Sequence, residues 1–270
     1  MRQWFLALLL VLIPAAAAAQ DSALKQLDTT DAGRAWQAVG RLDINGRGFC
    51  TGALIAPDLV LTAAHCLFDK ATKEPIRVES IEFLAGWRNG RASAYRQIRR
   101  AVVHPNYVYT GSVTSARVRN DLALLQLVRP IRNTSVTPFE TGREPRRGDA
   151  VGVVSYAKSR SEAPALQEVC SVMGRQEGVL VMSCDVDFGS SGAPIFAFDG
   201  QTARIVSVVS AKAEVEGTKV ALGTQLDRPL QVLRAELTAG RSLGSAGVAS
   251  VGRITVGGGR SSTGAKFVKP

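Results

Sequence analysis

Short apolar runs separated by turn residues dominate the chain from Trp36 onwards. Runs such as Val-Gly-Val-Val-Ser-Tyr and Ile-Val-Ser-Val-Val-Ser are rich in β-branched residues, which is typical of strands. The pattern predicts six strands in the first half, at 37–44, 48–56, 59–63, 78–85, 95–103 and 121–127. It predicts six more in the second half, at 149–156, 166–173, 179–184, 194–198, 203–210 and 218–225. Two closed antiparallel barrels would account for this spacing, so we expect an all-β fold of two six-stranded barrels.

Other stretches divide the chain into segments. A polar, proline-containing connection separates the two sets of strands, and apolar residues at helical spacing over 229–237 predict a helix that begins with a proline. The last thirty residues are rich in Gly and Ser and too poor in apolar surface to fold, so we expect a flexible basic tail. The expected segments are a signal peptide at 1–19, a lead-in or short propeptide at 20–35, the first barrel at 36–128, the connection at 129–148, the second barrel with its helix at 149–240, and the tail at 241–270.

The first nineteen residues carry the pattern of an export signal. Arg2 precedes an apolar run over 4–13, and Pro14 and five alanines follow. Ala17 and Ala19 satisfy the small-x-small cleavage pattern. A membrane anchor is the alternative, but the run is too short to span about 30 Å of hydrocarbon. We therefore expect a secreted or periplasmic protein whose mature chain has no membrane span.

The charge of the chain does not indicate a nucleic-acid partner. The formal net charge is +10, but residues 241–270 hold five basic residues and no acid, and Arg2 lies in the expected signal peptide. Residues 20–240 therefore carry only +4, which is ordinary for a protein surface.

Four cysteines in an exported chain indicate two disulfides, and four cysteines allow three pairings. We predict the pairs Cys50–Cys66 and Cys170–Cys184, because each pair flanks two neighbouring predicted strands. A metal site is the competing interpretation. No Cys-x-x-Cys pair exists, and His65 and His104 are the only histidines, so we expect neither a metal nor another cofactor.

Three short segments carry residues suited to nucleophilic catalysis. They are Thr-Ala-Ala-His-Cys ending at Cys66, Asn-Asp-Leu-Ala-Leu around Asp121, and Gly-Ser-Ser-Gly-Ala-Pro around Ser191. A serine hydroxyl attacks an amide only when a neighbouring imidazole takes its proton, and a buried carboxylate holds that imidazole in one tautomer. Glycines beside the serine let backbone N–H groups face the developing negative charge. Each segment alone has an ordinary structural explanation, but the order His65, Asp121, Ser191 is much more specific.

With these motifs the chain resembles the trypsin-like (chymotrypsin-family) serine proteases over about residues 36–235. Residues 62–66 match the family's Thr-Ala-Ala-His-Cys motif, residues 121–125 match its Asp-Leu-Ala-Leu-Leu strand, and residues 189–194 match Gly-Asp-Ser-Gly-Gly-Pro with two changes. The resemblance implies a chymotrypsin-like fold and a serine endopeptidase that acts on polypeptide substrates as a monomer. It also implies that Gly189 and Ser191 supply oxyanion-hole N–H groups and that Ser207 lies on the strand lining the substrate cleft.

The departures from the family pattern carry information. Ser190 stands where the animal enzymes have the acid that pairs with a newly exposed α-amino group, so we expect hydrogen bonds to order the oxyanion loop instead. This variant is similar to bacterial glutamyl-endopeptidase-like relatives. Asp185 has the position of the basic-specificity acid, whereas Val209 would narrow the pocket, so the preferred substrate side chain stays open.

Two other functions compete with a protease. A catalytically silent homologue that binds partners usually lacks a triad member, and this chain keeps all three. A non-protease hydrolase such as an esterase typically orders its triad as Ser, Asp, His on an α/β scaffold. The strand-rich pattern here weighs against such a scaffold.

Overall fold

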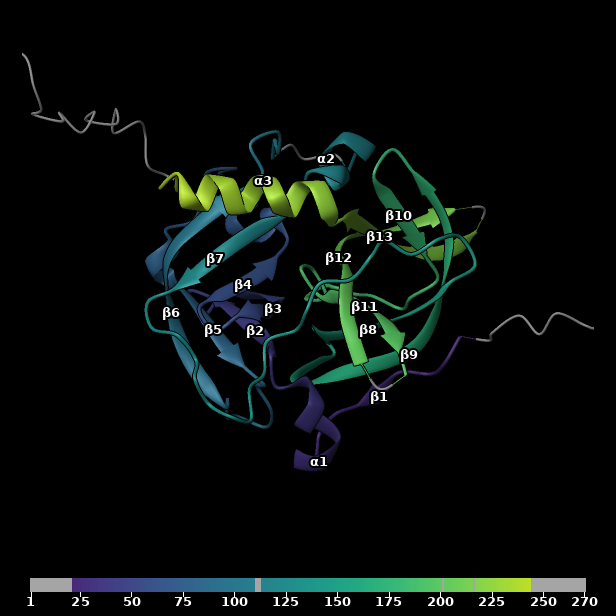
Figure 1. The fold of residues 1–270 in the computed structure, drawn as a ribbon, viewed down its shortest axis with the longest axis horizontal. Helices are drawn as coiled ribbons and strands as arrows, with labels where there is room; N and C mark the ends of the chain where they lie inside the picture. The colour runs from purple at the N-terminus through teal and green to yellow at the C-terminus, as the bar shows by residue number, and fades with distance from the viewer. Residues whose placement is uncertain (1–20, 110–112, 201, 216, 244–270) are drawn as a thin grey trace, which may run out of the picture.

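The chain forms two β-rich units that lie side by side, with helix α3 (Asp227–Thr238) crossing the first of them (Figure 1). This computed structural model describes residues 21–109, 113–200, 202–215 and 217–243. The expected signal peptide and all but the first three residues of the expected tail lie outside the described residues.

Six strands close the first unit into an antiparallel barrel in the order β2-β3-β4-β7-β6-β5. Their bounds are β2 Val39–Ile44, β3 Gly48–Ala56, β4 Leu59–Thr62, β5 Ile81–Ala85, β6 Ala94–Val103 and β7 Ala123–Leu127. β4 is buried along its whole length, because β3 and β7 pair with its two edges. All six strands that the sequence predicts for this half are present.

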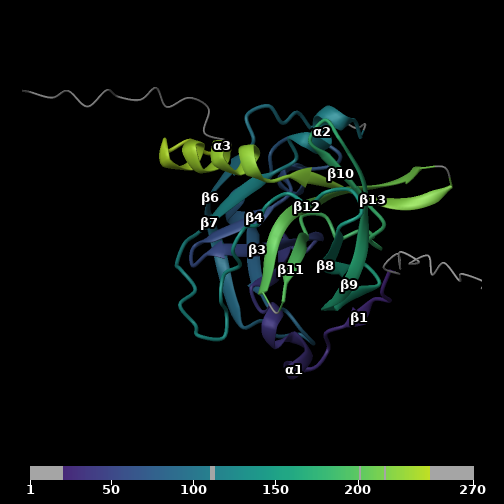
Figure 2. The ribbon, with the colours of Figure 1, turned by 45° about the vertical axis from the view of Figure 1, so that its right-hand side comes forward.

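The second unit also contains the six predicted strands. Their bounds are β8 Ala150–Ala157, β9 Arg160–Gln176, β10 Val179–Met182, β11 Pro194–Asp199, β12 Thr202–Val215 and β13 Thr218–Gln225. The sheet order is β9-β10-β13-β12-β11-β8, and β8 also pairs with β9, which closes these strands into a ring. β9 and β12 are longer than predicted, and the end of the β12–β13 hairpin extends away from the ring (Figure 2). The expected all-β, two-barrel, chymotrypsin-like architecture is confirmed.

An aromatic cluster joins the two units. Trp36 precedes β2, Phe139 lies in the connection between the units, and Phe196 belongs to β11. The Phe196 ring lies 5.0 Å from that of Trp36 and 4.8 Å from that of Phe139, and both contacts are edge-on. Edge-on aromatic pairs add to the stabilisation from burial. The core is therefore continuous between the two halves that form the cleft.

The lead-in segment is part of the fold. It forms β1 (Lys25–Gln26), α1 (Thr30–Gly33) and the 3-10 turn η1 (Arg34–Trp36). β1 pairs with β9, and the buried Leu27 donates its N–H to the Pro164 carbonyl over 2.9 Å. The sequence interpretation as an irregular lead-in missed these contacts, because so short a strand has no periodicity of its own.

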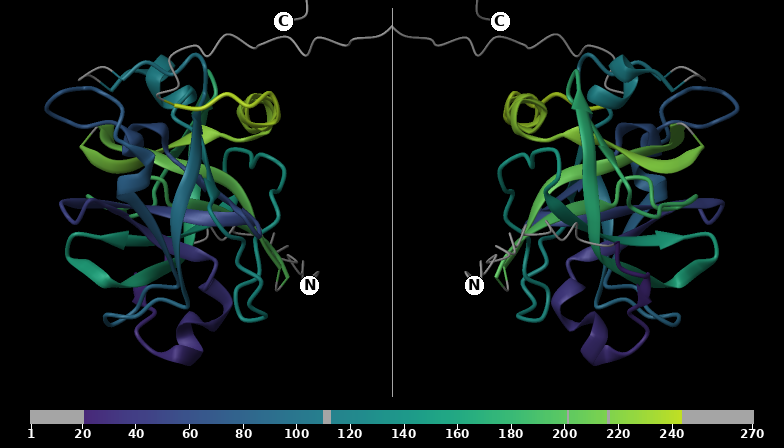
Figure 3. Two further views of the ribbon diagram at one scale, coloured as in Figure 1. Left: turned by 90° about the vertical axis from the view of Figure 1, so that its left-hand side faces the viewer. Right: turned by 90° about the vertical axis from the view of Figure 1, so that its right-hand side faces the viewer.

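Apart from α3, the helices that remain to be described are short. They are α2 (Ser115–Arg119) and the 3-10 turns η2 (Ala64–Leu67) and η3 (Val78–Ser80). Helix α3 follows the last strand of the second unit yet contacts β6 and β7 of the first, through a face that buries Leu230 and Leu233. Figure 3 shows this helix nearly end-on beside the strands. The predicted helix at 229–237 is thus confirmed.

Both predicted disulfides are present. Cys50–Cys66 ties β3 to η2, and Cys170–Cys184 ties β9 to the loop that follows β10, two positions after its last residue. Closing loops of this length stabilises a fold by about 3 kcal/mol in the loop-entropy model. The first bridge fixes the turn that carries His65, and the second fixes the start of the loop that leads to Ser191.

Candidate active site

His65 and Asp121 meet at one end of the first barrel. His65 lies in η2 directly after β4, and Asp121 lies just before β7, which is the neighbour of β4. The His65 ring Nδ1 lies 2.7 Å from Asp121 Oδ2, and the His65 backbone N–H donates to Asp121 Oδ1 over 2.8 Å. The Asp121 side chain is only 1% exposed and that of His65 is 14% exposed. Because a carboxylate only accepts hydrogen bonds, Nδ1 carries the proton and Nε2 keeps its lone pair.

A third contact completes the surroundings of the carboxylate. The Ser210 hydroxyl donates to Asp121 Oδ2 from β12, so the second unit also supports this acid. Thr224 Oγ1, on β13, donates to the Val118 carbonyl just before Asp121. A buried charge is tolerated when hydrogen bonds surround it, so these contacts keep Asp121 in place beside His65.

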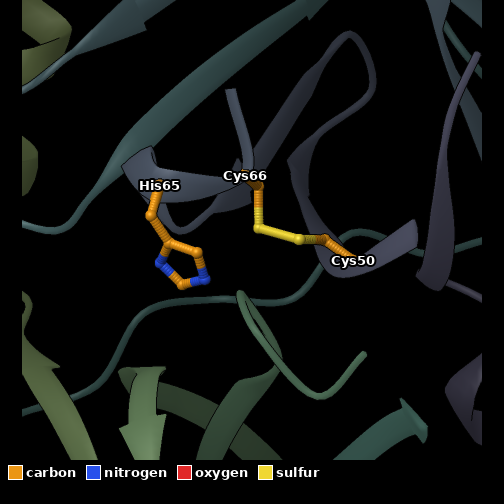
Figure 4. A group of neighbouring side chains, drawn as sticks. All are labelled: Cys50, His65 and Cys66. Atoms are coloured by element: carbon orange, nitrogen blue, oxygen red, sulfur yellow. A yellow bond between two sulfur atoms is a disulfide. The ribbon is translucent and has the colours of Figure 1, made fainter. Parts of the chain in front are cut away.

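The Cys50–Cys66 disulfide lies next to the His65 ring, as Figure 4 shows. One ligand atom from each of these three residues falls within 4.8 Å of the others. The two sulfurs are bonded to each other, and a metal ligand would have to be a free thiolate. His65 Nδ1 is also engaged by Asp121. This group therefore belongs to the support of His65 and is not a metal centre.

The loop before β11 places Ser191 opposite His65. A cavity of about 220 Å³ is lined by both residues, together with Phe188 and the β12 residues Val209 and Ser210. In the described part of the chain, no hydrogen bond joins the Ser191 hydroxyl to the His65 ring. Such catalytic hydrogen bonds are often long in free enzymes and shorten when substrate binds.

Two backbone N–H groups in the loop that carries Ser191 have no hydrogen-bond acceptor among the described residues. Gly189 has a φ of +100°, and the N–H groups of Gly189 and Ser191 donate to no acceptor within the described residues. Thr51 on β3 holds the loop, since its hydroxyl donates to the Gly189 carbonyl over 2.9 Å and its N–H donates to the Ser191 carbonyl over 2.8 Å. Fixed, unpaired N–H groups at such a turn suit the oxygen of a tetrahedral intermediate.

Ser190, between these two residues, is fully buried. Its Oγ accepts the N–H of Asp187 over 3.3 Å and lies 3.2 Å from Ser155 Oγ and 3.3 Å from the Tyr156 carbonyl oxygen. These contacts supply the hydrogen bonds expected from a serine at this position. Adding a Cβ to Gly189 would place it 2.3 Å from the Phe49 ring, so the tight turn also requires glycine.

The residues expected to set specificity have different environments. Asp185 lines a second cavity, of about 720 Å³, and is exposed, while Val209 lines the cavity that holds His65 and Ser191. Ser207 lines neither cavity, because it is buried and donates its hydroxyl to the Thr224 carbonyl. Ser210, three residues later, has the place in the cleft that the sequence interpretation gave to Ser207.

A β-bulge lies next to Ser210. β12 pairs with β13 through Val209 and Ala211, and residue 210 is left without a partner in the register. A bulge inserts one residue and re-aims the side chains around it. The sequence holds serine at both 207 and 210, and no signal distinguishes them before the bulge is known. The sequence interpretation also missed Arg160 and Lys212, which come from two different strands and line the larger cavity.

His104, the other histidine, is buried away from this group. Its Nδ1 accepts the N–H of Asn106 over 3.3 Å, and burial lowers the pKa of its imidazole although Glu236 opposes that shift. These contacts give His104 a structural role, separate from the group around Asp121. Among the described residues, no helix is long and apolar enough to cross a membrane.

Comparisons with known proteins agree with this geometry. The family model described as Trypsin matches residues 27–226. Serine protease 56 of Homo sapiens is 29% identical over 155 residues, which are 56% of this chain and only 23% of that protein. Trypsin of Simulium vittatum is 29% identical over 194 residues, which are 61% of this chain and 73% of that protein. A solved Glu endopeptidase has the same fold, with a TM-score of 0.66, 19% identity, and coverage of 82% of this chain and 100% of that one.

Proposed function

Since this chain belongs to the trypsin family, we propose that it is a secreted serine endopeptidase that hydrolyses peptide bonds through His65, Asp121 and Ser191. The observation that carries the proposal is the preassembled site. A buried carboxylate holds the His65 ring, the ring and Ser191 share one cavity, and the N–H groups of Gly189 and Ser191 have no acceptor among the described residues. A silent homologue would have no need for all of these features at once.

The first half of the reaction forms an acyl-enzyme. The Ser191 Oγ attacks the carbonyl carbon of the scissile peptide, and its proton passes to His65 Nε2. The carbonyl oxygen becomes an oxyanion that accepts hydrogen bonds from the N–H groups of Gly189 and Ser191. Asp121 stabilises the imidazolium through Nδ1–H. The C–N bond then breaks, the amine leaves with the proton from His65, and Ser191 remains as an ester.

Water completes the reaction in the second half. His65 Nε2 takes a proton from water as its oxygen attacks the ester carbonyl, and the oxyanion forms again in the same place. The intermediate collapses, the carboxylic acid leaves, and the proton returns to the Ser191 oxygen. The site ends as it began, and the reaction consumes one water per peptide bond.

The edge of β12 supports a polypeptide substrate. β11 pairs with β12 only as far as Val208, whereas β13 pairs with it as far as Val215. One backbone edge of residues 210–215 is therefore free of strand partners among the described residues. An extended peptide can add to such an edge as another strand, beside Ser191.

The two disulfides and the export pattern of residues 1–19 support secretion.

Cleavage of a mixed peptide library by the purified chain tests the proposal. We expect new peptide termini, read by mass spectrometry, and loss of all cleavage after treatment with a fluorophosphonate, because that reagent modifies an activated serine. Cleavage that resists the reagent would contradict a serine mechanism. A folded chain that yields no new termini would point to the silent homologue.

The Ser210 hydroxyl provides a further prediction, and Ser207 provides its control. We expect Ser210→Ala to lower kcat for peptide hydrolysis by about 10-fold to 100-fold, because a hydrogen bond to a buried charge is worth about 1.5–3 kcal/mol. Ser207→Ala, on the same strand, should leave kcat within about threefold, because its hydroxyl donates to the Thr224 carbonyl and not to the Asp121 carboxylate. Steady-state kinetics on one peptide, with thermal unfolding of both variants, measures this. Equal losses in the two variants would contradict a role in supporting Asp121.

A further inference from the structure

The cavity of about 720 Å³ lies next to the cavity that holds His65 and Ser191. The two cavities share Val186, Asp187 and Lys212 in their walls. A substrate side chain that precedes the scissile bond can therefore enter the larger cavity while its carbonyl lies at Ser191. Asp185 lines this cavity, and an unopposed carboxylate there would attract lysine or arginine side chains.

Asp185 is opposed by Arg160, which is the first residue of β9 and lines the same cavity. Arg160 Nη2 donates to Ser155 Oγ over 3.0 Å, while its buried Nε has no hydrogen-bond partner within the described residues. Burial lowers the pKa of the guanidinium, and the negative charges of Asp185 and Asp187 oppose that shift. An arginine stays charged in proteins, so a fixed positive charge faces these two acids.

The second acid of the wall is also neutralised. Lys212 Nζ lies 2.7 Å from Asp187 Oδ1 and 4.2 Å from the centre of the Phe188 ring. Within the described residues, Asp185 has no hydrogen bond through its side chain and no ion pair shorter than 4.0 Å. The other two cations in the wall of this cavity, Lys212 and Lys219, are exposed, so Arg160 is the partly buried cation that shares the cavity with Asp185.

We propose that Arg160 is a specificity-determining residue, which cancels the charge of Asp185 and so prevents the cavity from preferring lysine and arginine side chains. The inference rests on the proposed function, because it assigns the substrate side chain of that same site. A substrate side chain without charge loses no binding affinity when Arg160 faces Asp185. A cationic side chain meets the Arg160 guanidinium, and like charges brought together in a partly buried place repel each other.

Arg160→Gln tests the proposal as a gain of function. Peptides that differ only in the residue before the scissile bond, with Arg, Lys, Gln, Ala or Leu there, would be compared by kcat/KM. We expect the Arg and Lys peptides to improve by about tenfold or more relative to the three uncharged peptides. Arg160→Lys should keep the preference of the native chain. Lys158→Gln, an exposed neighbour that does not line the cavity, removes the same formal charge and should change nothing.

Two further variants make the test decisive. Asp185→Asn added to Arg160→Gln should abolish the gain, because the gain depends on the freed carboxylate. Fluorescence titration with p-aminobenzamidine, a cation, measures how tightly the cavity binds a positive charge. In a Ser191→Ala background this measurement does not depend on catalysis. Tighter binding by at least about tenfold on replacing Arg160 supports the proposal even if the native chain hydrolyses no peptide. Unchanged binding and unchanged preference, or a native chain that already prefers Arg and Lys, would overturn it.

Discussion

His65→Ala is expected to lower kcat for peptide hydrolysis by about 10⁶-fold, because the Ser191 hydroxyl then has no base to take its proton. The ring is held by one buried carboxylate, and no other histidine lies in the cavity with Ser191. The oxyanion N–H groups remain in this variant, so a small residual rate over water is expected. The variant should keep its fold, because the His65 ring is partly exposed and its backbone N–H bond to Asp121 does not depend on the side chain.

His104→Ala is the matched control for this variant. It removes the only other histidine, which is buried and outside the cavity, so we expect a lower unfolding temperature with kcat within about threefold. Single-turnover kinetics on one peptide, with circular dichroism on each variant, would separate the two effects. A His65→Ala variant that retains more than about one-hundredth of the native kcat would contradict the role of general base.

Asp121→Asn is expected to lower kcat by about 10⁴-fold while changing KM little. The carboxylate accepts three hydrogen bonds, from the His65 ring, the His65 backbone N–H and the Ser210 hydroxyl. The side-chain amide of the Asp121→Asn variant would have only one acceptor oxygen, and its NH₂ group is a donor. Where that NH₂ group faces His65, it donates to Nδ1 and so selects the wrong tautomer of the imidazole. Nδ1 would then accept and Nε2 would carry the proton, which leaves no lone pair to activate Ser191.

Asp43→Asn is a suitable control, since Asp43 is a partly exposed acid on β2 outside the two cavities. This substitution should leave kcat within about threefold, because Asp43 touches neither cavity and its partners are Arg41 and the Gly46 N–H. Steady-state kinetics of both variants on the same peptide measures the difference. If Asp121→Asn retained native kcat in a folded protein, the carboxylate would have only a structural role.

Much of this fold could be predicted from local patterns in the sequence. β-branched runs between turn residues located all twelve barrel strands, and the two disulfides followed from the strands that their cysteines flank. His65, Asp121 and Ser191 could be found because each lies in a short motif within three residues of the end of a strand. Their convergence depends on β4 pairing with β7 and on the loop between β10 and β11.

What the sequence could not predict depends on non-local geometry. Ser210 and not Ser207 reaches Asp121, and a run of small and β-branched residues with serine at both positions does not show which of them faces the first unit. β1 exists only because β9 extends far enough to pair with it. Arg160 follows a hairpin 25 positions before Asp185, and only the paired strands bring both to one cavity. The charges that a substrate side chain meets in this cavity therefore could not be predicted from the sequence.

The central claim is that His65 activates the hydroxyl of Ser191. Its most direct test is labelling of the folded chain with a fluorophosphonate, followed by digestion and mass spectrometry to locate the modified residue. We expect one label per chain, on Ser191 and not on its neighbour Ser190, and we expect the label to be lost in both Ser191→Ala and His65→Ala. A label on another residue, or an unchanged labelling rate in His65→Ala, would contradict it.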